Sequence, residues 1–287
     1  MTLQRSSGSG RDPRRVAARL LLAIAGVVLA VIAGRIVDHR LSVRTALAEG
    51  EDAFRRGDFR QAAAKFKFAL DLDPASTDVR LRLIAAYHKQ FVPGGESRAN
   101  LEIAAQTLDE IARVLERDPS NRVALVAAGE IHDGRSEYDQ ARDWYRRLIA
   151  IDSSNATAFA GLSATSLKQV SGAVFDAEAR AGLLPAAFAP LASVPKASGR
   201  PIAKDDIRMS LAERWSTTIA EGIDAGTRAA AIDRENAGLM LTLSAWHKLA
   251  ADLAASPDEY HRNMTSAADW RHKAHDVRRL RAERGAR

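Results

Sequence analysis

Two histidines near the end of the chain have a spacing that could hold a metal ion. His272 and His275 are three residues apart, which places them on one face of a helix, and Asp269 and Asp276 stand close by. A zinc site needs at least three protein ligands. No cysteine or HExxH motif completes this set. The sequence therefore predicts solvated histidines beside surface acids, with neither a metal site nor a cofactor.

The sequence motifs of catalysis are missing. There is no GxSxG elbow, phosphate-binding glycine loop or kinase-like motif, and the one Gly-x-Gly, at residues 8–10, follows no strand. The absence of cysteine excludes disulfides, thiolate metal sites and cysteine nucleophiles. Four tryptophans are predicted to be packing residues rather than a ligand cage: Trp144, Trp215, Trp246 and Trp270. We therefore expect a protein that is not an enzyme.

Basic residues gather near both ends of the chain, within a net charge of +6. Arg278, Arg279 and Arg281 could contact nucleic acid or anionic lipid. No nucleic-acid-binding motif accompanies them, and cations at the C-terminus of a helix are favoured by the helix dipole. We expect a solvated helix end, with contact to a membrane surface as the second interpretation, and no nucleic-acid partner.

The elements that must carry any function repeat along the chain. Residues 43–76 place small and large apolar residues in an order typical of two antiparallel helices, in a unit of about 34 residues. The small residues let the helices approach, the aromatic fills the adjacent space, and the proline ends the second helix. These packing positions are Gly50, Gly57, Ala62, Phe66, Ala69 and Pro74.

The same order returns later in the chain in one constant register. Gly129, Tyr138, Ala141 and Tyr145 stand where the first unit has glycine, phenylalanine, alanine and phenylalanine. Segments equivalent to Leu72-Asp73-Pro74 also recur, at Arg117-Asp118-Pro119, Ile151-Asp152-Ser153 and Ile232-Asp233-Arg234. One unit cannot bury its own apolar face, so we expect the copies to stack.

Residues 43–76 resemble a tetratricopeptide repeat, whose common spellings include a Gly-Asp-Phe turn followed by alanine, here Gly57 to Phe59 and then Ala62. The resemblance implies an all-α solenoid of helix–turn–helix repeats that binds proteins or peptides. The closing part of the chain, from Glu221 to Trp270, resembles the C-terminal part of bacterial tetratricopeptide proteins. That resemblance implies no activity.

The repeats and their interruptions divide the chain. We expect a long last helix from Pro257, because Ser256 and Glu259 form a capping box around it. Gly222 and Gly226 are expected to weaken a helix earlier in this part. The segments are a basic N-terminus (1–15), an apolar segment (16–37), repeats at 43–170 (43–76, 77–121 with an insertion at 91–100, 122–155 and a partial repeat at 156–170), a Pro- and Ala-rich irregular insertion (171–209), and C-terminal repeat-like helices with a basic tail (210–287).

The apolar segment 16–37 is predicted to be a transmembrane anchor. Fifteen uncharged residues separate Arg19 from Arg35, and snorkelling arginines extend this length enough to cross a bilayer. The arginines that precede it favour an N-terminus in the cytoplasm, with the repeats in the periplasm. The alternative is a signal peptide cleaved after Ala33.

A candidate binding surface is the concave face formed by the first helix of each repeat. Its residues carry mixed charge, which suits an extended peptide or a partner helix; the alternative is that they are ordinary solvated residues. They are Glu51, Arg55, Arg82, His88, Lys89, Glu130 and Asp133. In co-chaperone repeats this groove clamps a terminal carboxylate with lysine and asparagine, but here Leu47 and Glu51 occupy those places, so no such clamp is expected.

These features predict a membrane-anchored interaction scaffold or assembly factor in the bacterial inner membrane, with protein or peptide partners outside the cytoplasm. One alternative is a soluble periplasmic factor that holds unfolded clients after signal cleavage. Another is an accessory subunit whose 171–209 insertion embraces one permanent partner.

Overall fold

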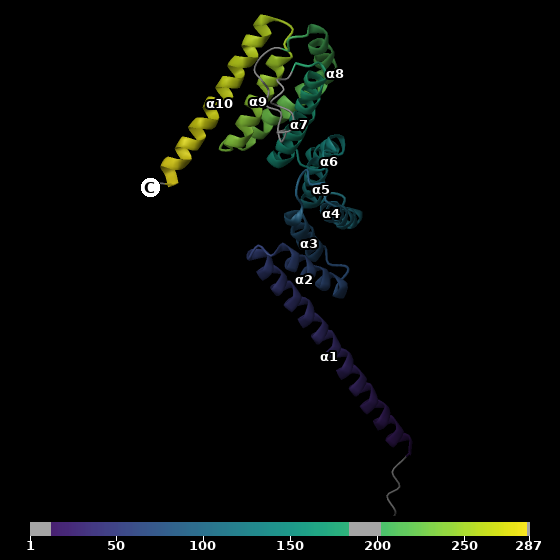
Figure 1. Cartoon of the computed structure of the whole chain (residues 1–287). Coiled ribbons are helices and arrows are strands. Elements are labelled where there is room, and N and C mark those ends of the chain that lie inside the picture. Colours follow the sequence, from purple (N-terminus) through teal and green to yellow (C-terminus); the bar gives the residue numbers. More distant parts are fainter. Residues whose placement is uncertain (1–12, 184–201, 286–287) are drawn as a thin grey trace, which may run out of the picture. The chain divides into compact units, whose positions relative to one another are not determined.

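The computed structural model describes residues 13–183 and 202–285, and in this part of the chain every regular element is a helix (Figure 1). The contacts divide the chain into two compact units, residues 1–86 and 87–287. The helices are α1 (Pro13–Arg55), α2 (Phe59–Leu72), α3 (Thr77–Gln90), α4 (Arg98–Arg117), α5 (Arg122–Gly134), α6 (Tyr138–Ile151), α7 (Ala156–Arg180), α8 (Asp205–Ile232), α9 (Ala237–Asp252) and α10 (Pro257–Gly285). The all-α prediction is confirmed.

The first helix of the first repeat does not begin near residue 43. It is the end of α1, which runs unbroken from Pro13 because residues 38–42 contain neither glycine nor proline to stop it. The side chains of residues 13–25, 33 and 36 lie outside the described residues, so much of the predicted span 16–37 does too. In the described part of the chain, no helix has an apolar stretch long enough to cross a membrane.

The helix pair α1–α2 packs as the spacing of small and large residues predicts. A methyl group added to Gly50 would lie 2.6 Å from the Phe66 ring, so glycine is needed for this close approach. Gly57 turns the chain with a positive φ of 80°, and the Asp58 side chain caps α2 by accepting from the Gln61 N–H. In the third repeat, Ser136 takes the place of Gly57 and adopts the same left-handed conformation, with φ 60°.

A shared turn joins one repeat to the next, as the recurring aspartates predict. Asp118 ends α4 and accepts hydrogen bonds from Ser120 and from the Asn121 amide, while Asn121 caps α5 by accepting from the Ala124 N–H. The bond from the Ser120 hydroxyl is the main reason that the pKa of Asp118 lies below its usual value. The same contacts recur after α6. After α8 the serine is missing, and Asn236 donates to Asp233 and accepts from the Gly238 N–H.

The insertion predicted at 91–100 is shorter and more ordered than expected. Helix α4 begins at Arg98 after the N-cap Ser97, so only residues 91–97 are a loop. The buried Asn100 side chain accepts from the Val92 N–H at 2.8 Å and donates to the carbonyls of Val92 and Gly95 at 2.8 and 2.7 Å. The loop is therefore fixed by a side chain of the helix that follows it.

Replacing Asn100 by alanine is expected to lower the free energy of unfolding by about 1–2 kcal/mol, because it leaves backbone groups near a buried position without partners. Hydrogen exchange should accelerate first at residues 91–97. Thermal unfolding with peptide-resolved hydrogen exchange measures both effects. Glu96→Ala, at an exposed position in the same loop, serves as the control and should change little. Equal effects of the two changes would contradict this role of Asn100.

Both predicted bounds of the irregular segment 171–209 are wrong. Residues 171–180 continue α7, and Asp205 begins α8. The first extension is helical because it contains no proline and buries Val174 in a cluster with Val170. Residues 184–201, which hold most of the predicted insertion, lie outside the described residues. On the far side of the gap, the Ile202 N–H donates to the Asp252 carbonyl at 3.0 Å.

In two helical hairpins of the second unit, α7–α8 and α9–α10, a serine at the equivalent position forms a hydrogen bond from the first helix to the second. The buried Ser163 hydroxyl donates to the Gly222 carbonyl, and Ser244 donates to the Ala267 carbonyl, both at 2.7 Å. Gly222 does not weaken α8 as expected, because its missing side chain makes room for the indole of Trp246. A methyl group added to Gly226 would likewise lie 2.8 Å from the Ser163 hydroxyl oxygen. The predicted helix from Pro257 is observed as α10.

Candidate functional site

The predicted surface residues of the first unit are joined to one another. Glu51 on α1 forms an ion pair with Arg82 on α3, and Arg82 also contacts Asp78 at 3.0 Å. Arg55 is strongly exposed and lies 3.6 Å from Asp52. The side chains of Glu51 and Arg82 thus link consecutive first helices.

The predicted residues of the second unit are joined in the same way. His88 Nε2 on α3 lies 3.2 Å from a Glu130 carboxylate oxygen on α5. Asp133, one turn further along α5, accepts from the Thr165 hydroxyl at 2.9 Å and pairs with Lys168, both on α7. Lys89 is exposed at the end of α3. The first helix of each repeat, α1, α3 and α5, is therefore joined to the first helix of the following repeat by a charged or polar contact.

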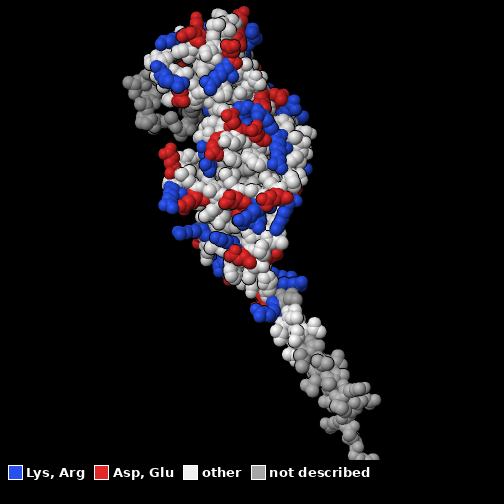
Figure 2. Space-filling model, turned by 90° about the vertical axis from the view of Figure 1, so that its right-hand side faces the viewer, with Lys and Arg blue, Asp and Glu red and all other residues white. Residues whose placement is uncertain are grey.

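These contacts leave the charges unequally accessible. The Asp133 side chain is only 17% exposed and both its oxygens have partners, so it holds α5 to α7. Lys168 remains 48% exposed and Glu130 44% exposed, which leaves both open to a further contact. We call the second-unit set His88, Lys89, Glu130, Asp133 and Lys168 the charge row. Figure 2 shows basic and acidic side chains interspersed over the face that it draws.

Lys168 and Thr165 were missed from the sequence, as was the exposed Val123 at the start of α5. Aligning the turn at Asp118 with the turn at Asp152 brings Lys168 opposite Gly134, next to Asp133. That register was the available signal for placing Lys168 beside the predicted residues. No sequence motif marks Thr165.

A second polar network joins α6 to α8. Arg146 donates twice to the Glu221 carboxylate, each at 2.7 Å, and Arg142 donates to it at 3.3 Å. Arg142 is largely buried and also donates to Gln169 of α7 at 2.8 Å. The hydrogen bond from Arg146 is the main reason that the pKa of Glu221 lies below its usual value. The network fixes α8 against the preceding repeat.

Glu221→Gln is expected to lower the free energy of unfolding at pH 7 by about 1 kcal/mol, as for a partly exposed charge network. A carboxylate whose pKa is lowered by folding adds stability above its unfolded pKa, about 4.3, and that stability is lost as the pH falls below it. The difference from the parent chain should thus be complete at neutral pH and clearly smaller at pH 3. Urea unfolding at both pH values tests this. A difference that persists undiminished in acid would contradict the ionic origin.

The histidines with metal-like spacing lie apart from these networks. His272 and His275 are exposed on α10. Within residues 13–183 and 202–285, no three His, Cys, Asp or Glu side chains come together as metal ligands. The basic end of α10 contacts an acid, since Arg284 lies 3.0 Å from Glu235. Trp270 of α10 packs against α9, which makes it a packing residue as predicted, with Lys273 above its ring.

Comparison with known proteins identifies the repeats. Residues 47–90 and 98–156 match the family model of the tetratricopeptide repeat. Among solved structures, MamA 41-end from Desulfovibrio magneticus RS-1 is 14% identical with a TM-score of 0.52, covering 83% of this chain and 96% of that chain. A crystal structure of MamA protein is 14% identical with a TM-score of 0.50, covering 84% and 94%. A search of curated proteins gives no match. At this identity the structural likeness shows the fold alone.

Proposed function

We propose that this chain, a tetratricopeptide repeat protein, is a non-enzymatic, membrane-anchored scaffold or assembly factor that presents the concave face of its repeats outside the cytoplasm. The observation that carries the proposal is the charge row, in which the accessible side chains of Lys89, Glu130 and Lys168 alternate in sign along consecutive first helices. Such a surface suits a partner segment with its own alternating charges, held as an extended peptide or a helix.

The charge row is tested by exchanging two of its charges. Lys89→Glu combined with Glu130→Lys keeps the net charge and alters two accessible positions. We expect recovery of crosslinked partners from membranes to fall roughly tenfold, as for the loss of about 1.4 kcal/mol of binding free energy. Quantitative mass spectrometry after affinity capture measures it.

The matched control exchanges charges away from the row. Glu213→Lys with Arg234→Glu also keeps the net charge, at two exposed positions of α8 and the turn after it. This variant should recover partners as the parent chain does. If the row variant folds, as judged by circular dichroism, and still recovers the same partners in the same amounts, the charge row is not the binding face.

Membrane anchoring is supported by the apolar run at 16–37 and by the large apolar side chains that α1 exposes where they are described. These are Val27, Val28, Leu29, Val31, Ile32, Val37 and Leu41. Such a surface is costly in water and stable in a bilayer. An intact N-terminus in detergent-extracted membranes is the expected result. A chain that begins at Gly34 in the soluble fraction would instead favour the cleaved, client-holding factor.

A further inference from the structure

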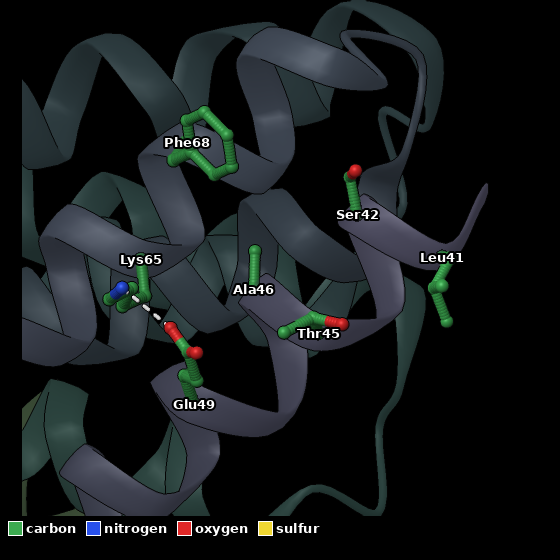
Figure 3. A pocket seen from close by; sticks show the side chains of 7 residues that line it. All are labelled: Leu41, Ser42, Thr45, Ala46, Glu49, Lys65 and Phe68. Carbon is green, nitrogen blue, oxygen red and sulfur yellow. Dashed lines mark ion pairs between the residues drawn. The ribbon is translucent and has the colours of Figure 1, made fainter. Parts of the chain in front are cut away.

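A shallow hollow in the first unit, between α1 and α2, has an unusual lining. Phe68 on α2 is 52% exposed and Leu41 on α1 is 60% exposed, and both border the hollow. Figure 3 shows these side chains with the smaller ones between them and the Lys65–Glu49 ion pair. At the equivalent place of the third repeat, the chain has Arg147 where the first repeat has Phe68. The exposed aromatic of the first repeat is therefore not copied in the third.

This apolar edge continues the exposed apolar surface of α1. Val37 and Leu41 are four residues apart and so lie on the same side of the helix, and both are exposed. The hollow reaches from Leu41 across Thr45 and Ala46 to Phe68. The first hairpin thus extends the apolar surface of α1 sideways onto α2.

Helix geometry places this edge at a definite height. With a rise of 1.5 Å per residue, Leu41 lies about 6 Å beyond Val37, the last residue of the predicted span. The headgroup layer on each side of a bilayer is roughly 5–8 Å thick. If residues 16–37 cross the membrane, Leu41 reaches the outer part of that layer. The hollow continues to Thr45, about 12 Å beyond Val37, so Phe68 reaches the lipids when α1 leaves the membrane tilted toward α2.

The charges near the hollow suit anionic lipid. Arg40 and Arg44 follow the predicted span on α1, and Lys67 precedes Phe68 on α2; all three are exposed. Lys65 is already paired with Glu49. Exposed cations close to apolar side chains are typical of surfaces that lie on anionic headgroups.

We propose that the α1–α2 hairpin lies on the surface of the bilayer, with Phe68 and Leu41 inserted among the lipids and Arg40, Arg44 and Lys67 at lipid phosphates. This inference rests on the proposed membrane anchoring. This contact would fix the direction in which α1 leaves the membrane. Partner binding would then fall to the later repeats.

The test is a fluorophore at position 64 of the full chain in vesicles. The protein has no cysteine, so Ala64→Cys provides a single labelling site, exposed and one turn before Phe68 on α2. An environment-sensitive dye there should shift to shorter wavelength in vesicles of phosphatidylglycerol and phosphatidylcholine. It should also be quenched by lipids with a nitroxide on the headgroup. A dye at Val123→Cys, an exposed position at the start of α5, should show neither effect.

Two further variants identify the groups responsible. Phe68→Ser should reduce the quenching at position 64, and Arg44→Glu with Lys67→Glu should remove the dependence on phosphatidylglycerol. Flotation of the vesicles reports anchoring separately. Protein that fails to float overturns the anchoring proposal, whereas protein that floats with an unquenched dye at position 64 overturns only the bilayer contact. A wavelength shift that depends on protein density and not on the nitroxide lipid would overturn the bilayer contact and assign the hollow to a second copy of the chain.

Discussion

Replacing Trp246 by alanine should lower the free energy of unfolding of the second unit by about 3–5 kcal/mol, the range for a large buried aromatic. Trp246 is completely buried in a cluster with Val170, Leu211 and Leu249. Its indole N–H donates to the Ser163 hydroxyl at 3.0 Å. The substitution therefore removes apolar burial and one partner of a buried hydroxyl together. Urea unfolding followed by circular dichroism measures the loss.

Trp144→Ala is the matched control. Trp144 is only half-buried on α6, where it stacks near His132 and lies under Arg147. Its loss should cost clearly less. Gly222→Ala tests the packing from the other side, because the added methyl would lie 2.1 Å from the Trp246 ring. We expect it to cost about 1–3 kcal/mol in the parent chain and much less beside Trp246→Ala. Equal costs in the two backgrounds would contradict the contact.

This packing could not be predicted from the sequence, although its register could. Aligning the Asp-x-x-Asn turn at Asp152 with the one at Asp233 places Ser163 over Ser244. Both serines make the same hydrogen bond in their hairpins. In contrast, Gly222 is a poor helix former by local propensity. Only the position of Trp246, on the next helix along the chain, explains why glycine is needed there.

The repeat register places Glu130 and Asp133 on the same helix, but it does not say which side chains they contact. In the structure, Glu130 pairs with His88 of α3 and Asp133 with Lys168 of α7. Which side chains pair between neighbouring helices depends on their length and rotamer, and the periodicity of the sequence contains no information on either. Thus the Lys168–Asp133 pair was missed. The loop at 91–97 was misjudged for a similar reason, because Pro-Gly-Gly signals a turn while the bonds from Asn100 that order it are set by the fold.

Tyr145 provides the strictest test of the repeat register, because the sequence aligns it with Phe66. The Tyr145 ring lies between Gly129 of α5 and Gly161 of α7, and an added methyl would come within 2.7 Å and 2.4 Å of it. Tyr145 is buried, and burial is the main cause that raises the pKa of its phenol. A methyl group on either glycine would therefore push the ring against the helix on its other side.

Gly161→Ala is therefore expected to lower the free energy of unfolding by about 3 kcal/mol, the upper end for an overpacked site. Helix propensity alone predicts the opposite sign, a gain of about 1 kcal/mol for alanine over glycine. Gly172→Ala separates the two effects, because Gly172 lies in the same helix and no atom lies within 4 Å of an added methyl. It should stabilise the protein. A smaller side chain at the ring, Tyr145→Leu, should reduce the cost of Gly161→Ala. If both glycine variants stabilise, the close approach of α6 and α7 at Tyr145 is not what requires glycine.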